Sequence, residues 1–171
     1  MVSTTVSYQA AMEYIQRIPE ILGRKDSKSQ FVQAVFWGTV VREMFRKMHR
    51  SYDLRSKGGA DELGKWRKLK PRTVAIKKRL GYKSTADLIN VRTKSLLNSY
   101  RPGRVSNGYI PANAHQLVEM TRWRVTLGTK HKHADAVNKL RTIFPDVPTR
   151  WVVEAIESGL RAVVPLLGSL R

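Results

Sequence analysis

The residue types that most often carry catalysis or bind metals are sparse in this chain of 171 residues. Two of its four histidines, His131 and His133, form a His-x-His pair, and on a strand this spacing points both rings to one face. Together with Asp135 the pair would supply the three protein ligands of a metal-dependent hydrolase. The pair lies in an expected loop between lysines, so solvent-exposed histidines are the favoured interpretation. The other two histidines are His49 and His115.

Acids and nucleophiles give no stronger signal for catalysis. Glu154 and Glu157 are spaced to share one helix face, but that face is the polar side of an expected surface helix. Cysteine is absent, which excludes disulfides, thiolate zinc sites, iron–sulfur clusters and cysteine nucleophiles. The sequence has no glycine-rich phosphate loop, no Gly-x-Ser-x-Gly and no His-Glu-x-x-His. We therefore expect no enzymatic activity, no metal and no cofactor.

Positive charge is the dominant feature of the composition. Lys and Arg number 32 and Asp and Glu 13, for a net charge of +19. Residues 42–104 hold nineteen basic and five acidic side chains, a net +14, whereas 1–41 and 105–171 carry +1 and +4. A surface of this kind attracts polyanions or acidic partners. The densest run supplies the candidate contacts: Lys65, Arg67, Lys68, Lys70, Arg72, Lys77, Lys78, Arg79 and Lys83.

Two kinds of partner fit this basic run. Because Trp66 and Tyr82 lie among the cations, the segment could neutralise phosphates and stack on bases. No recognition helix, zinc finger or RNP-like motif accompanies it, so sequence-specific reading is not expected. One hypothesis is therefore a sequence-independent nucleic-acid-binding module that uses residues 65–83. The other is contact with an acidic protein surface.

Helical periodicity covers much of the first half of the chain. Apolar residues recur at steps of three and four over 8–22, and a wider apolar stripe follows over 30–49. A wide stripe must be covered on more than one side, and neighbouring subunits are one way to cover it. Residues 51–64 are expected as an exposed loop. A short basic helix is expected over 72–80, stopped by Gly81.

The second half mixes strand and helix signals. Residues 85–99 are expected as a short helix, or a helix passing into a strand. Pro-Gly and Asn-Gly pairs within 101–108 predict a hairpin. Alternation of Trp123, Val125 and Leu127 with polar residues predicts a half-exposed strand within 116–127. Two further helices are expected, over 132–143 and from Pro148 onward.

The sum of these elements is an α+β fold, a small antiparallel sheet flanked by helices, with an N-terminal helical arm. Residues 1–50 are expected to form that arm and residues 51–171 the α+β domain, the two making one structural unit. The start of the chain does not resemble a signal peptide. The longest apolar run, 151–167, is interrupted by charges, so no membrane contact is expected.

Parts of the sequence resemble motifs of bacteriophage virion-morphogenesis and tail-completion proteins, of the Mu-type and lambdoid kinds. These proteins carry W-x-x-L-x-P-x-T-x-x-x-K, then L-I-x-x-T-G-x-L-x-x-S, then a strand ending in Gly-Thr and a Pro-containing segment before a C-terminal helix. Here Asn90, Val91 and Arg92 fill the gap before the Thr, and Lys94 stands where the family usually has Gly. The matching residues are Trp66, Leu69, Pro71, Thr73, Lys77, Leu88, Ile89, Thr93, Leu96, Ser99, Gly128 and Thr129.

The resemblance implies a non-enzymatic structural protein of the phage neck, the head–tail junction. Such a protein forms a ring that completes the tail or connects it to the head, and tail-terminator and head-completion roles stay open beside tail completion. Its implied partners are other copies of itself and neighbouring neck, portal-adaptor or tail-tube proteins, with genomic DNA in the lumen as a further candidate. Its implied location is the virion, after assembly in the host cytoplasm.

A ring closed by rotation needs apolar surface on two different faces of each subunit. The candidate subunit-interface residues are Phe36, Trp37, Val41, Met44 and Trp151, with monomer core as the alternative interpretation. The basic segment would face either the genome or an acidic neighbouring ring. DNA that passes through a channel must not stick to it, so the acidic partner is favoured.

Overall fold

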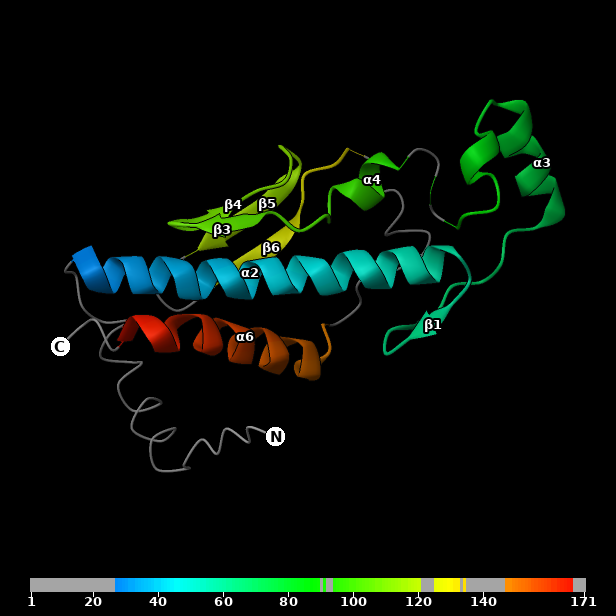
Figure 1. Cartoon of the computed structure of the whole chain (residues 1–171). Coiled ribbons are helices and arrows are strands. Elements are labelled where there is room, and N and C mark those ends of the chain that lie inside the picture. Colours follow the sequence, from blue (N-terminus) through cyan, green and yellow to red (C-terminus); the bar gives the residue numbers. More distant parts are fainter. Residues whose placement is uncertain are drawn as a thin grey trace, which may run out of the picture.

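One long helix, α2 (Ser27–Ser56), forms the centre of the computed structural model, which describes residues 27–89, 91, 94–120, 125–132, 134 and 147–167. At 1.5 Å per residue its thirty residues extend about 45 Å. The C-terminal helix α6 (Thr149–Leu167) lies along one side of α2, together with the hairpin of residues 60–65. The hairpins of residues 104–110 and 116–129 lie along the other side (Figure 1). Gly58, with a φ of +83°, lies just beyond the end of α2 in the left-handed conformation that glycine adopts at low cost.

The strands pair as antiparallel hairpins, which confirms the α+β class. In the described part of the chain β1 (Ala60–Asp61) pairs with β2 (Gly64–Lys65), β3 (Arg104–Ser106) with β4 (Gly108–Ile110), and β5 (Gln116–Met120) with β6 (Val125–Thr129). The short helices between them are α3 (Pro71–Arg79), the 3₁₀ turn η1 (Lys83–Thr85) and α4 (Ser95–Asn98). The hairpin predicted over 101–108 is thus β3–β4, where Val105 pairs with Tyr109.

The α2–α6 pair is the main helix–helix contact, and the two helices run antiparallel (Figure 1). Lys47 of α2 is hydrogen-bonded to Glu154 near the start of α6. Further along, α6 has Gly159, and a Cβ there would lie 2.8 Å from Val40 and 2.9 Å from Phe36. The backbones therefore approach too closely for any side chain at this crossing.

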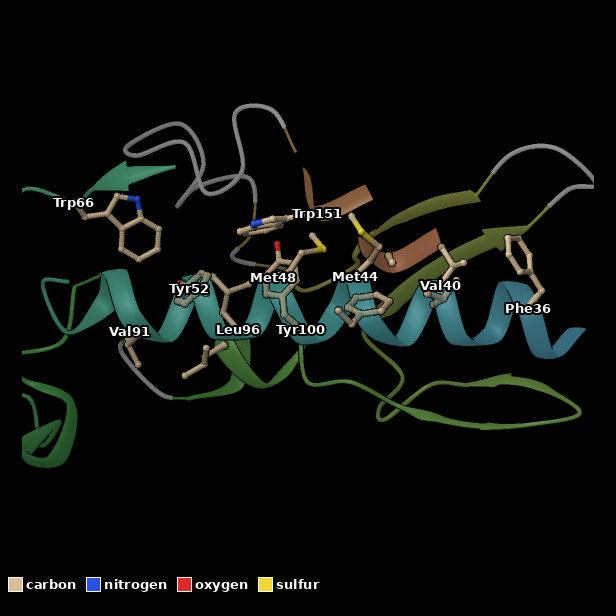
Figure 2. Close-up of a cluster of buried hydrophobic side chains, with 14 of the residues drawn as sticks. Phe36, Val40, Met44, Met48, Tyr52, Trp66, Val91, Leu96, Tyr100 and Trp151 are labelled. Atoms are coloured by element: carbon tan, nitrogen blue, oxygen red, sulfur yellow. The ribbon is translucent and has the colours of Figure 1, made fainter. Parts of the chain in front are cut away.

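The opposite side of α2 packs against the β3–β4 and β5–β6 hairpins and the segment before them. The ring of Phe45 stacks on that of Tyr109 in β4, with centroids 5.8 Å apart, and Tyr52 stacks on Tyr100 at 5.9 Å. Figure 2 shows this core along α2, with Trp151 and Val91 on opposite sides of the helix. Because α2 is covered on two sides, its apolar stripe is wider than that of a helix that packs on one side only.

A buried glutamine joins the base of the β3–β4 hairpin to β5. The Gln116 side-chain oxygen accepts from the backbone N–H of Ala112 (2.8 Å) and from the Tyr109 hydroxyl (3.1 Å). Its amide donates to the carbonyl of Arg101 (2.7 Å). These bonds satisfy a polar group that is 6% exposed.

Several sequence-based boundaries change. The domain boundary at residue 50 falls inside α2, so residues 27–50 are the centre of the core rather than an arm. Residues 51–56 are helical instead of a loop, because buried Tyr52 and Arg55 extend the packed face of α2. Among the described residues of 85–99, the only α-helix is the single turn α4. The helices expected over 8–22 and 132–143, and Trp123, lie outside the described residues, apart from a few residues at the start of the second helix.

The half-buried His49 on α2 gives the fold a pH dependence. Burial lowers the pKa of His49, Arg101 and Lys57 lower it further, and Asp53 opposes them. The unfolded chain then binds more protons than the folded one between the lowered value and the ordinary 6.5. Stability should therefore rise with pH through this window, and the same contribution is lost as the pH falls through it. Urea titrations at pH 5 and 7 should show a smaller difference for His49→Gln than for the unsubstituted chain, and an equal difference would contradict this origin.

Candidate functional site

The basic segment found in the sequence, residues 65–83, becomes a protruding arm in the structure. We call it the basic arm. Its helix α3 lies beyond the end of α2, away from the α2–α6 pair (Figure 1). No residue of α3 is buried, and its main neighbour is η1.

Trp66 fixes the start of the basic arm to the core. Its ring is 6% exposed, meets Tyr52 edge-on with centroids 5.0 Å apart, and has the Arg55 guanidinium 4.5 Å from its centroid. Arg55 is itself 1% exposed and lies 3.9 Å from the Asp61 carboxylate. Leu69, three residues after Trp66, packs half-buried against the same core.

Local signals set the limits of α3 close to those predicted. Pro71 occupies the first turn, where its fixed φ suits a helix and its missing N–H costs no hydrogen bond. Gly81, with a φ of +85°, follows the C-cap residue Leu80, and its N–H donates to the carbonyl of Lys78 (3.1 Å). Thr73 is exposed in the first turn.

Lys77 has a structural role that its neighbours lack. Its ammonium donates to three backbone carbonyls, those of Thr85 (2.6 Å), Leu88 (2.9 Å) and Val91 (2.7 Å). Burial lowers its pKa, and Asp87 opposes that effect. All three ammonium donors are used within the chain, so Lys77 does not join the other cations as a contact for a partner.

Seven of the remaining cations of the basic arm are exposed and have no ion-pair partner among the described residues. The segment 65–83 holds no acidic residue. Within the part of the chain that the structure describes, seven of its cations take part in no ion pair: Lys65, Lys68, Lys70, Arg72, Lys78, Arg79 and Lys83. Arg67 is exposed as well. Two large apolar side chains lie among them, Ile76 at 39% and Leu80 at 53% exposure.

The second motif of the resemblance is buried and joined to β6. Ile89 and Leu96 are core residues, and Leu88 is half-buried. The Thr129 hydroxyl donates to Ser99 Oγ (2.9 Å), and the Ser99 hydroxyl donates to the carbonyl of Leu96 (2.6 Å). Beside Thr129, Gly128 has room for a Cβ, with Leu117 atoms 3.7 and 3.9 Å away.

Lys94, at the place of the family's usual Gly, has a φ of −70°, which any residue adopts. Glycine's conformational freedom is therefore not required here. Thr93 lies outside the described residues.

His115 and His131 form a small polar cluster with Ser95. His131 Nε2 lies 3.0 Å from Ser95 Oγ, and the His115 and His131 rings meet edge-on at 5.1 Å. His133 and Asp135, the other proposed ligands, lie outside the described residues. Among the residues that the structure does describe, no three His, Asp or Glu side chains gather closely enough to hold a metal.

The two carboxylates considered for catalysis are engaged in ion pairs. Glu154 accepts from Lys47 and from Arg150, the latter at 2.6 Å, and these bonds, the one from Lys47 foremost, lower its pKa. Glu157 pairs with Arg161 at 3.7 Å. Glu154, which the bonds from Lys47 and Arg150 hold in its charged form, is a poor general acid.

A groove of about 290 Å³ opens between α2, the β1–β2 hairpin and the start of α6. Both charge signs line it, with Arg46 and Arg50 beside Asp61 and Glu62. Glu62 pairs with Arg150 at 3.6 Å. The charges of this groove partly neutralise one another, so it presents no single-signed site for a ligand.

The subunit-interface residues proposed from the sequence are mostly core of one subunit. Phe36, Val41, Met44 and Trp151 are at most 7% exposed, and Trp37 is half-buried. The interface assignment is wrong for the four buried residues, because α6 and the hairpins of the same chain already cover α2.

The structure exposes other apolar residues of α6, the helix that the sequence offered as an interface through Trp151, and sequence reasoning did not single these residues out. Val152, Val153, Ile156 and Val164 are 38–48% exposed. We call these four residues the α6 outer face. Val152 and Ile156 lie one turn apart on the helix, next to the face that buries Trp151 and Ala155. The available signal was the width of the apolar stripe in the sequence of α6, which is broader than one buried face requires.

Comparisons of the chain with models of protein families, with curated proteins and with solved structures find no match. None of the described helices is long and apolar enough to cross a bilayer.

Proposed function

We propose that the chain is a non-enzymatic structural protein of the phage neck, forming a ring that completes the tail or connects it to the head. Its partners would be copies of itself and neighbouring neck, portal-adaptor or tail-tube proteins, and its place the assembled virion. The polar motif residues carry this proposal, because they hold the motif segments to one another. Lys77 of the first motif bonds to carbonyls within and beside the second, and Ser99 of the second bonds to Thr129 of the Gly-Thr strand.

Motif residues that also hold distant segments of the fold together support the proposal that this chain has the same architecture as the phage proteins that carry the motif. The spacing of Lys77, Ser99 and Thr129 has a physical reason in this fold, because each side chain must reach a partner from another segment. The proposal concerns architecture and assembly, since these residues are packed or bonded within the chain.

The α6 outer face offers one of the two surfaces that such a ring needs. The whole chain carries +19, so copies repel each other unless they meet on a surface of low net charge. Over 149–167, α6 has two basic and two acidic side chains, paired as Arg150–Glu154 and Arg161–Glu157. Its exposed valines and isoleucine can therefore pack against a neighbour without charge repulsion.

Paired glutamates on the α6 outer face test this interface. Val153→Glu with Ile156→Glu should convert a discrete, ring-sized oligomer into a monomer, because burying two unpaired carboxylates is strongly unfavourable. Both positions are exposed in the subunit, so its melting temperature should change little. Mass photometry at 150 mM salt gives the mass. Ser106→Glu with Asn107→Glu, at the exposed β3–β4 turn, adds the same charge as a control. An oligomer that survives the α6 substitutions contradicts this assignment.

The neck function itself is tested by the protein composition of purified particles and by DNA binding. Mass spectrometry of particles purified from the organism that encodes the chain should find it in fixed stoichiometry with tail and portal proteins. The alternative is the sequence-independent nucleic-acid-binding module, which the uncompensated cations favour. It predicts a monomer or dimer that binds duplex DNA by itself, with affinity falling steeply as salt rises. That result, with no copies in particles, would overturn the neck proposal.

A further inference from the structure

The basic arm is fixed to the rest of the chain although its helix buries almost no side chains. Its helix α3 has no buried residue. Yet the buried ring of Trp66 anchors the chain before α3, and the Lys77 ammonium ties the helix to three carbonyls of 85–91. An element that contributes little burial but is fixed in orientation is preorganised for contact with something else, which lowers the entropic cost of binding.

The exposed surface of α3 combines apolar and basic side chains in a specific order. Ile76 and Leu80 are four residues apart and so lie on one face, one turn from each other. Lys78 and Arg79 lie between them in sequence, and Arg72 and Lys83 lie at the two ends of the helical region. Amphipathic helices of this kind bind by placing spaced apolar anchors into a groove.

We propose that the basic arm is a docking element whose Ile76 and Leu80 enter an apolar groove on another protein, with Asp and Glu side chains along the rim of that groove. The unpaired cations of the arm face the acidic rim and guide the approach, while the two aliphatic side chains supply buried area. The inference goes beyond the neck proposal, because a groove of this chemistry can belong to a particle protein or to any other.

A single-stranded nucleic acid fits the arm less well than an acidic protein does. Binding to single strands relies on exposed aromatic rings on which bases stack. Trp66 is only 6% exposed, and its ring is engaged by Tyr52 and Arg55. The large apolar side chains that the arm does expose, Ile76 and Leu80, are aliphatic and provide no stacking face.

A second copy of this chain is also a poor partner for the arm. Two copies, each with a charge of +19, repel one another. Six of the acidic residues in the described part of the chain already pair with cations of the same chain: Glu43, Asp53, Asp61, Glu62, Glu154 and Glu157. The rim that the arm requires must therefore come from a different, acidic protein.

Site-specific photocrosslinking tests the proposal in the full chain. p-Benzoylphenylalanine replaces Leu80 in the organism that naturally makes the protein, and cross-linked peptides are sequenced after irradiation. We expect one dominant product, a protein segment in which apolar residues are flanked by Asp and Glu. Lys78→Glu with Arg79→Glu should lower its yield by roughly tenfold through like-charge repulsion. The same probe at exposed Ser106, on the β3–β4 hairpin, is the matched control and should not give this product.

Every other product contradicts the docking proposal. Cross-links to nucleic acid would assign the arm to the binding-module hypothesis, and cross-links to another copy would make it a subunit interface. Absence of any product, or a yield unchanged by the charge reversal, would also overturn it. The fate of the neck function is separate. If the acidic partner is found but is absent from particles, the docking proposal holds and the neck role fails. If the chain forms rings but no acidic partner is found, the neck role holds and the docking proposal fails.

Discussion

Gly159→Leu is expected to lower the free energy of unfolding by about 3 kcal/mol or more. A Cβ at this position would lie 2.8 Å from Val40 and 2.9 Å from the ring of Phe36, closer than carbon atoms approach without displacement. Both neighbours are buried core residues of α2 and are at most 6% exposed, so they have little room to move. The added side chain must push α6 away from α2 along their main contact. Urea unfolding followed by circular dichroism measures the loss.

Two further substitutions separate overpacking from the effect of replacing a glycine. Gly159→Ala gains about 1 kcal/mol of helix propensity, but it still introduces the clashing Cβ, so it should be destabilising rather than stabilising. Gly128→Ala, in β6, adds the same methyl group where the nearest atoms are 3.7 Å away, and it should be tolerated. If Gly159→Leu unfolds at the same urea concentration as the unsubstituted chain, the close α2–α6 crossing is wrong.

The limits of the helices and hairpins were predictable wherever the signal is local. Pro71 and Gly81 bracket α3, and the Asn107–Gly108 pair marks the turn of β3–β4, because each acts through its own backbone conformation. Pro148 likewise precedes α6, where its carbonyl accepts from the N–H of Trp151 at 2.8 Å. These residues need no knowledge of what lies across the fold.

What covers an apolar face was not predictable, because that depends on distant segments. The wide stripe of α2 indicated cover on more than one side, and a neighbouring subunit and the same chain fitted that pattern equally. The structure assigns the cover to α6 and to Tyr109 of β4, more than sixty residues further along. The same limit hid the α6 outer face, since exposed Val152 and Ile156 have the same side-chain chemistry as buried Val163.

The positive charge of residues 65–83 identified the candidate site, but the sequence did not show which of its lysines are exposed and which have a structural role. Lys77 and Lys78 are adjacent and chemically identical in the sequence. The difference is that α3 directs Lys77 toward the carbonyls of 85–91, whereas Lys78 is exposed to solvent. The motif resemblance did single out Lys77. The carbonyls that it serves lie at the end of the 3₁₀ turn η1 and in the segment after it, which no periodic pattern reveals.

Lys77→Met should release the basic arm. The methionine keeps most of the aliphatic length but removes three hydrogen bonds, leaving the carbonyls of Thr85, Leu88 and Val91 without their shared donor. Hydrogen bonds to a charged donor contribute about 1.5–3 kcal/mol each where they are well formed. Since Lys77 is only half-buried and water can replace part of the loss, we expect a cost of about 2 kcal/mol. The backbone amides of α3 should also exchange faster with deuterium.

Lys78→Met is the matched control. It removes the same charge at the next position, and the Lys78 side chain has no partner among the described residues. Its effect on unfolding should stay within about 0.5 kcal/mol, and exchange in α3 should not change. The pair also separates the two roles of the basic arm. Lys77→Met should weaken docking by disordering α3, whereas Lys78→Met should weaken it by removing a cation from an ordered helix. If both variants exchange alike, the three-carbonyl tether does not position the arm, and its orientation must come from Trp66 and Leu69 alone.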